Sequence, residues 1–396
     1  MHRLPLALLL FALAIPAQAQ RLAVAADTLY TMAGPPIVNG VVLMRDGKIE
    51  RVGAGLAIPE GVRTLRASVV TPGLVDVRGT VGLSGLLNQP QDQDQIDEGG
   101  PIQPSLRALD AYNARDELVP YLLGFGVTTV HTGHTYGAIA AGQTVVVKTA
   151  YDTVDEALVD STTMLAMSIG PSVTRRFSSP GSRSRVIADL RKALYKAKAA
   201  SSKADSSGTV DLDQQAWAQV LSGDMPALVT AHRANDILTL LRVAREFPTM
   251  NLILDGGAES YLVLDELRDA GISVVLHPTM IRMGGETQNA SFTTAATLHE
   301  AGIPFAIQSG YEAYVPKTRV VLFEAAAAAA HGLPREAALA SVTLEAATIL
   351  GLADRVGSIE TGKDADLALF DGDPLETTSH VCAVIVDGRV ASEECQ

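Results

Sequence analysis

The chain has 396 residues, of which 47% are hydrophobic and only 5% aromatic, and its formal net charge at pH 7 is -13. This composition is that of a packed α/β protein and excludes a disordered or fibrous chain. Because acidic proteins repel nucleic-acid phosphates and anionic lipids, we expect neither nucleic acid nor a membrane surface as a partner.

The first residues have the pattern of a secretory signal peptide. His2 and Arg3 precede an apolar run over 4–15, and small residues at Ala17 and Ala19 follow Pro16. We therefore predict a signal peptide over 1–19, cleaved after Ala19, and export to the periplasm or the medium. A retained membrane anchor is the alternative. No later stretch reaches the ~20 apolar residues of a membrane span.

Both ends of the mature chain are rich in short strands. Asp46-Gly47 and Asp387-Gly388 each lie between apolar residues, a pattern typical of tight β-hairpins. We expect 20–70 and 353–396 to pack together as one small β-sandwich. Cys382 and Cys395 flank the second hairpin and are the two cysteines of the chain. In an exported protein they could form a disulfide or stay as free thiols, and the sequence leaves both open.

The middle of the chain, 71–352, alternates short apolar runs with amphipathic helical patterns. The helical patterns include 234–247 and 259–269, and the predicted strands are 69–77, 127–131, 144–147, 228–231, 252–255, 273–277 and 305–309. This alternation indicates an α/β fold with a parallel sheet, long enough for a (β/α)8 TIM-like barrel. An acidic segment, 88–104, and a basic one, 176–206, interrupt the pattern. Both suit solvated surface, and the acidic one also suits a loop roofing the barrel mouth.

Two motifs resemble those of a known family. Val70-Thr71-Pro72-Gly73-Leu74-Val75-Asp76 resembles the first barrel strand of amidohydrolases, and 354–367 resembles their return into the β-rich domain. The likeness covers nearly the whole mature chain and is strongest for the imidazolonepropionase-like branch. It implies a metal-assisted barrel hydrolase acting on C–N bonds of small cyclic amides or peptides.

The positions at which the resemblance implies metal ligands hold unsuitable residues. The His-x-His of the first strand corresponds to Arg78-Gly79-Thr80, and the ligands of strands five, six and eight correspond to Thr230, Gly256 and Gly310. A guanidinium has no lone pair to give a metal, and threonine is a poor ligand. The usual metal site is therefore predicted to be lost. Lys148 matches a strand-four lysine that is carboxylated in some relatives.

Other polar residues at predicted strand ends could supply chemistry, because those ends converge on one face of a barrel. One hypothesis is a relocated zinc site built from His131, His134, His232 and Lys148; the alternative is that each histidine is simply hydrogen-bonded, with no cofactor bound. The catalytic candidates are His232, Glu312, Asp255 and Lys148. The substrate-binding candidates, which could instead form salt bridges, are Arg78, Thr80, Arg233, His277, Arg282, Lys317 and Arg319.

Two functions remain open from the sequence. The first is an exported amidohydrolase-superfamily protein with altered or lost catalysis, a pseudoenzyme that binds a small molecule or supports an active paralogue as a homodimer or heterodimer. The second is an active C–N bond hydrolase with a non-standard histidine and lysine site at the barrel mouth. Metal content and turnover distinguish the two.

Overall fold

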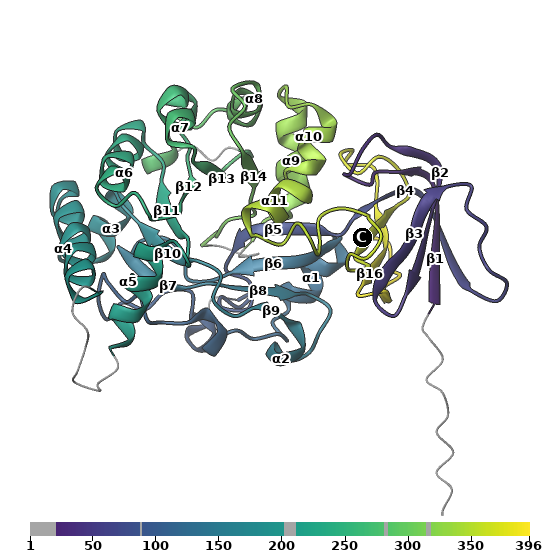
Figure 1. Ribbon diagram of the computed structural model, residues 1–396, viewed down its shortest axis with the longest axis horizontal. Helices are drawn as coiled ribbons and strands as arrows, with labels where there is room; N and C mark the ends of the chain where they lie inside the picture. Colours follow the sequence, from purple (N-terminus) through teal and green to yellow (C-terminus); the bar gives the residue numbers. More distant parts are fainter. Residues whose placement is uncertain (1–20, 88, 202–210, 281–283, 314–317) are drawn as a thin grey trace, which may run out of the picture.

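The computed structural model describes residues 21–87, 89–201, 211–280, 284–313 and 318–396. The predicted signal peptide lies outside these ranges. The α/β fold class is confirmed: a barrel-like α/β part stands beside a β-rich part made from both ends of the chain (Figure 1). Within the described ranges, no helix combines the length and apolarity that crossing a membrane requires.

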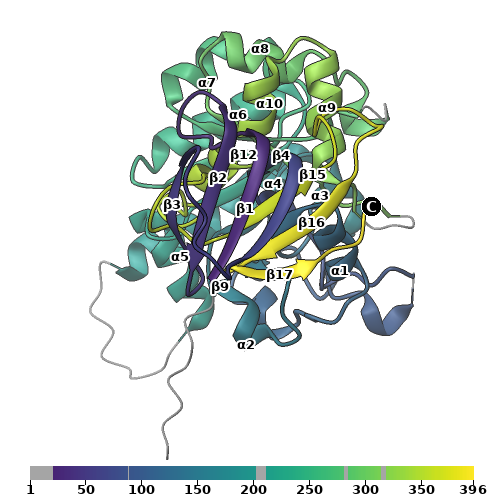
Figure 2. The same cartoon turned by 90° about the vertical axis from the view of Figure 1, so that its right-hand side faces the viewer.

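The β-rich part is one seven-stranded sheet, facing the viewer in Figure 2. Its strand order is β17-β16-β15-β4-β1-β2-β3, so the central pair β15–β4 joins the two ends of the chain. A buried apolar face, with Val24, Val42, Val70 and Ile385 among its residues, holds the sheet together. The strands are β1 (Arg21–Leu29), β2 (Ile37–Arg45), β3 (Lys48–Ala54), β4 (Arg63–Pro72), β15 (Leu367–Phe370), β16 (Val381–Val386) and β17 (Arg389–Ser392).

Two tight turns close hairpins in this sheet, as the sequence predicts. Asp46 and Gly47 have φ of 51° and 83°, and Asp387 and Gly388 have 47° and 69°. Positive φ at both central residues matches the right-handed twist of the flanking strands and explains the Asp-Gly pairs. Cys382 and Cys395 form a disulfide that ties the chain end to β16.

The barrel-like part is built from two sheets. The order of one is β14-β13-β12-β11-β10-β7, and that of the other is β5-β6-β8-β9. Thr144 alone separates β7 from β8, and Gly310 N, after β14, donates to Arg78 O in β5 (3.2 Å), so each edge strand of the six-stranded sheet is joined to the four-stranded sheet. The strands are β5 (Leu74–Gly79), β6 (Val127–Thr132), β7 (Ala140–Gln143), β8 (Val145–Lys148), β9 (Leu158–Asp160), β10 (Leu165–Ser168), β11 (Ala227–Ala231), β12 (Leu252–Gly256), β13 (Ser273–Leu276) and β14 (Phe305–Ile307).

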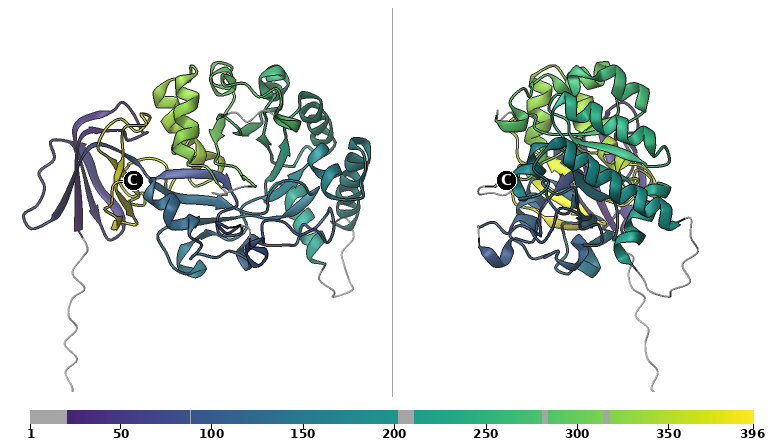
Figure 3. Two further views of the ribbon diagram at one scale, coloured as in Figure 1. Left: turned by 180° about the vertical axis from the view of Figure 1, so that it is seen from behind. Right: turned by 90° about the vertical axis from the view of Figure 1, so that its left-hand side faces the viewer.

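Helices form an outer layer around these strands, which Figure 3 shows from two further sides. Most apolar burial in the chain lies between helices and strands, in a cluster that includes Trp217, Leu240 and Leu254. The helices are α1 (Leu118–Gly124), α2 (Val154–Ala157), α3 (Pro171–Arg176), α4 (Arg183–Ser201), α5 (Leu212–Ser222), α6 (Ala234–Glu246), α7 (Leu264–Ala270), α8 (Thr294–Glu300), α9 (Val321–Ala330), α10 (Arg335–Ala340) and α11 (Leu344–Ile349).

The strands also bury side chains on their inner face. Leu228, Ile253, Val275 and Ala306, one each from β11, β12, β13 and β14, pack in one cluster with residues of β5 and β8. Because side chains alternate along a strand, the residues two positions further on share this inner face. Those residues are Thr230, Asp255, His277 and Gln308, and they place a polar layer at the carboxyl ends of the parallel strands.

Candidate functional site

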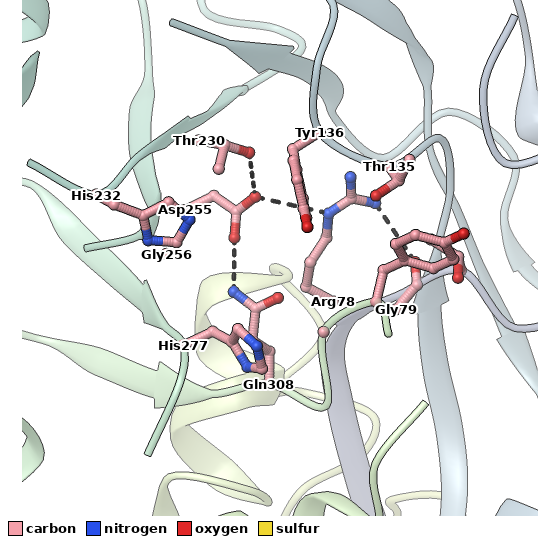
Figure 4. Close-up of a pocket in the computed structure, with 13 residues that line it drawn as sticks. Arg78, Gly79, Thr135, Tyr136, Thr230, His232, Asp255, Gly256, His277 and Gln308 are labelled. Carbon is pink, nitrogen blue, oxygen red and sulfur yellow. Dashed lines mark hydrogen bonds and ion pairs between the residues drawn. The ribbon is translucent and has the colours of Figure 1, made fainter. Parts of the chain in front are cut away.

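The polar layer lines a pocket at the carboxyl ends of β5, β11, β12, β13 and β14 (Figure 4). Ligand sites of barrel enzymes lie at this face. The pocket holds about 350 Å³ of empty volume, part of it open to solvent. Its lining residues are Arg78, Gly79, Thr80, Thr135, Tyr136, Thr230, His232, Asp255, Gly256, His277, Gln308, Gly310 and Tyr311.

Asp255 is fixed in the pocket by two neutral donors. Thr230 Oγ1 donates to Asp255 Oδ2 (2.5 Å) and Gln308 Nε2 donates to Asp255 Oδ1 (2.6 Å). The residue is 5% exposed. Thr230 lies on the neighbouring strand β11, opposite Asp255, whereas Gln308 follows β14, which β13 separates from β12, so donors from two sides of β12 position the carboxylate.

Arg78 brings a buried positive charge into the pocket. An irregularity in the pairing of β5 with β6, between Asp76 and Gly79, turns it toward the inner face. Arg78 Nη2 donates to His134 O, and Arg78 Nε lies 3.9 Å from Asp255 Oδ2. Burial lowers the pKa of the guanidinium, and Asp255 and Asp76 offset part of this effect. Arginine nevertheless stays charged in proteins, so this cation is permanent.

Asp76 supports the pocket without lining it. Its carboxylate is fully buried and accepts hydrogen bonds from Ser309 N (3.1 Å), Ser309 Oγ and Arg78 N (3.2 Å). Burial raises the pKa of Asp76 to about 6, although these hydrogen bonds and the charge of Arg78 act in the opposite direction. Asp76 therefore ties β5 to the end of β14, directly behind Arg78.

Two imidazole rings cover glycines of the pocket wall. A Cβ on Gly256 would lie 2.5 Å from His232 Cε1, and a Cβ on Gly310 would lie 2.7 Å from His277 Cε1. Within the described part of the chain, His232 Nδ1 and His277 Nδ1 are buried and lack hydrogen-bond partners. Burial lowers the pKa of His232 to about 4, Asp255 acts to raise it and His277 to lower it. His232 is thus neutral at pH 7.

The other two histidines of the hypothesised zinc site do not line the pocket. His131 is fully buried in β6, with Nδ1 on Val77 O (2.7 Å) and Nε2 on Thr144 Oγ1 (2.6 Å), so both nitrogens are occupied. His134 packs against Gly142, the Cβ of which would lie 2.6 Å from His134 Nδ1. Burial, followed by the charge of Arg78, lowers the pKa of His131 to about 3 and that of His134 to about 4.

Lys148 lies away from the pocket, contrary to its expected place at the barrel mouth. The physical reason is strand direction: β8 runs antiparallel to β6, with Lys148 opposite Thr129, so the end of β8 points to the other end of the barrel. There Lys148 Nζ contacts Asp364 (3.0 Å), Asp366 (3.1 Å) and Asp387. Burial acts to lower the pKa of Lys148, but these carboxylates outweigh it and raise the value.

The remaining predicted residues form ion pairs or lie outside the described ranges. Glu312 pairs with Arg319 (2.6 Å), which also contacts Glu324 (2.9 Å), and Arg233 pairs with Glu259 (2.8 Å). These ion pairs agree with the alternative interpretation of the sequence, in which such residues form salt bridges and do not bind substrate. Thr80 and His277 do line the pocket. Arg282 and Lys317 fall in segments that the structure leaves undescribed.

Sequence reasoning missed Thr135 and Tyr136, which follow β6 and contribute to the pocket wall. Burial raises the pKa of Tyr136, so the ring carries a neutral hydroxyl. A polar Gly-His-Thr-Tyr run directly after a predicted strand was the available signal.

The acidic and basic insertions, 88–104 and 176–206, meet through a surface ion pair between Arg176 and Glu98 (3.1 Å).

Comparisons with known proteins agree with this architecture. A family model described as "Amidohydrolase family" matches residues 226–391. The imidazolonepropionase of Brucella anthropi is 28% identical over 370 residues, which is 85% of this chain and 87% of that protein. The amidohydrolase tasK of Hapsidospora irregularis is 24% identical over 82% of this chain, but the match spans 36% of tasK, about a third of its length.

A solved structure gives the same answer. The crystal structure of an amidohydrolase from Thermotoga maritima superposes with a TM-score of 0.88 at 29% identity, covering 94% of this chain and all of that one. The match includes both the barrel-like part and the terminal sheet. The chain therefore belongs to the amidohydrolase superfamily of hydrolases and is imidazolonepropionase-like.

Proposed function

We propose that this chain is an exported member of the superfamily that binds a small molecule at the barrel mouth and does not carry out metal-assisted hydrolysis. The observation that carries the proposal is the guanidinium of Arg78 inside the pocket. It offers N–H donors and no lone pair, and its fixed positive charge repels a divalent cation.

The other pocket residues do not fit the family's metal either. Where the resemblance expects three further histidines and an aspartate, the chain has Thr80, Thr230, Gly256 and Gly310. A zinc site requires about three protein ligands. Among the residues that the structure describes, no group of three or more His, Cys, Asp or Glu side chains is placed to hold a metal. The oxygens of Asp255 already accept from Thr230 and Gln308.

Without metal activation, hydrolysis would need another way to make water nucleophilic, because free water is a very weak acid and is hardly ionised at pH 7. His232 is a general-base candidate of the pocket, and the charge of Asp255 acts on it. Its low pKa makes it a weak base, which favours binding over turnover. The pattern of 1–19 and the Cys382–Cys395 disulfide support export to an oxidising compartment.

Metal analysis of the purified exported protein tests the proposal. After dialysis against zinc and then buffer, we expect substoichiometric zinc and no turnover of cyclic amides or dipeptides. Stoichiometric zinc and turnover that are lost together in His232→Ala would overturn the proposal. Arg233→Ala is the matched control, since Arg233 pairs with Glu259 and does not line the pocket. Assembly with an active paralogue remains a prediction, to be tested by copurification.

A further inference from the structure

We propose that the pocket ligand is a small monocarboxylate, bound through its carboxylate group by Arg78, His232 and His277. The inference rests on the proposed function, because it assumes that Arg78 and not a metal provides the positive charge of the site. It concerns the chemical class of the ligand, which neither the fold nor the family determines.

The first step is that the guanidinium of Arg78 has unused donors. It has five N–H groups. Arg78 Nη2 donates to His134 O, and Arg78 Nη1 makes a long contact to Gly79 O (3.4 Å). Its approach to Asp255 is 3.9 Å, longer than a hydrogen bond. The charge is 95% buried and therefore weakly solvated, which strengthens its attraction for an anion that enters the pocket.

The second step is that Asp255 does not use up this charge. Its two oxygens are held by Thr230 and Gln308, each at hydrogen-bond distance. Both oxygens of Asp255 therefore have a hydrogen-bond donor other than Arg78, although the charges of Arg78 and Asp255 attract each other. A ligand carboxylate can therefore take the open donors of the guanidinium, forming the charge-assisted, planar contact that arginine favours.

The third step is the pair of imidazoles. Both line the pocket, and each has a buried Nδ1 without a partner in the described part of the chain. A neutral imidazole has one N–H and one acceptor nitrogen, and the tautomer follows the partner it meets. A bound oxyanion would fix each ring as a donor toward the ligand. Because each Nδ1 is shielded from solvent, the donor to the ligand would be the Nε2–H group, with Nδ1 as the acceptor nitrogen.

The charge of the pocket limits the ligand to one negative charge. Among the described residues that line the pocket, Arg78 is the one permanent cation, and the Asp255 carboxylate lies 3.9 Å from it, so Asp255 would repel a dianion such as phosphate about twice as strongly as a monoanion. The rings of Tyr136 and Tyr311, which line the pocket, suit a carboxylate on a small apolar body. Benzoate is a suitable probe, and benzamide is its neutral counterpart of nearly the same shape.

The test is isothermal titration of the purified protein with benzoate and with benzamide. We expect benzoate to bind and benzamide to bind at least about 10-fold more weakly, because one charge-assisted hydrogen bond contributes about that ratio or more. Equal affinity for the two probes, or binding of benzamide alone, would overturn the inference. Binding of neither probe would also overturn it. None of these three outcomes changes the metal content or the turnover that test the proposed function, so failure of the inference can be told apart from failure of the proposed function.

Variants sharpen the test. Arg78→Met should weaken benzoate binding about 10- to 100-fold and leave benzamide unchanged, with Arg233→Met as a matched control that keeps wild-type affinity. Since Arg78→Met leaves Asp76 and Asp255 without their counter-charge and could misfold, the probe comparison on the wild-type protein stands without it. Wild-type affinity for benzoate in folded Arg78→Met would contradict the assignment.

Discussion

Replacing Lys148 by methionine should destabilise the protein strongly and leave the pocket intact. The ammonium of Lys148 is 4% exposed and contacts three carboxylates, two of which, Asp364 and Asp366, are also 4% exposed. Removing one partner of a buried ion pair leaves an uncompensated charge and costs about 3–5 kcal/mol. The lost ion pairs lie at the junction of the barrel-like part with the terminal sheet, because Lys148 ends β8 and Asp366 precedes β15.

The assay is guanidinium chloride denaturation followed by circular dichroism, with the free energy of unfolding compared between variants. Lys48→Met is the matched control. Lys48 contacts Asp364 (2.5 Å) from a side chain that is 53% exposed, so its removal should cost no more than about 1 kcal/mol. Adding Asp366→Asn to Lys148→Met should restore part of the loss, because it removes one of the stranded charges. If Lys148→Met costs no more than Lys48→Met, the reasoning about burial is refuted.

Three further outcomes follow from the structure. Gly256→Ala should lower the free energy of unfolding by about 1–3 kcal/mol, since φ is +86° and the new Cβ would meet the His232 ring. The control is Gly271→Ala, where φ is +63° but the Cβ would enter open space, and it should cost only about 1 kcal/mol. Thermal unfolding of both variants measures the difference. Folding depresses the pKa of His232 from 6.5 to about 4, so the contribution of the neutral ring to stability is present above pH 6.5 and is lost as the pH falls to about 4. Over that interval the free energy of unfolding of a His232→Asn variant, measured by urea titration, should fall by about 3 kcal/mol less than that of the wild type. Equal losses in the two proteins would exclude a neutral buried ring. Reducing the Cys382–Cys395 disulfide should lower stability by up to about 3 kcal/mol, the loop-closure value for a link of this span, and a Cys382→Ser/Cys395→Ser protein that is insensitive to dithiothreitol is the control.

Local chemistry made much of the fold predictable from the sequence. The two Asp-Gly turns require positive φ at adjacent residues, and the structure has them at Asp46 and Asp387. The alternation of apolar runs with helical patterns predicted strands close to β11, β12, β13 and β14. Thr230, Asp255 and His277 then meet at one face, because parallel strands of one sheet end on the same side.

Long-range geometry was not predictable in the same way. Lys148 was expected at the barrel mouth because it follows a predicted strand, 144–147, and matches a strand-four lysine of the family, but neither feature gives strand direction, and β8 pairs antiparallel with β6. Likewise, His131 lies in β6 and His134 comes two residues after its end, but only the packing shows that Thr144 and Gly142 meet their rings. The partners of a buried side chain depend on elements that are distant in the sequence.

If the proposed function is correct, the packing around Gly256 and Gly310 predicts that single substitutions should not create a metal site in this pocket. Any side chain at either glycine would begin within 3 Å of an imidazole, at His232 or His277, and would occupy a backbone conformation that favours glycine. A histidine at position 256 therefore requires a smaller residue at position 232, and the same coupling holds for 310 and 277. Removal of the Arg78 charge would be needed as well, and that would leave the buried Asp255 without its cation. These residues form one packed and electrostatically coupled unit, so the proposed metal-free pocket would need several coupled substitutions before it could hold a metal.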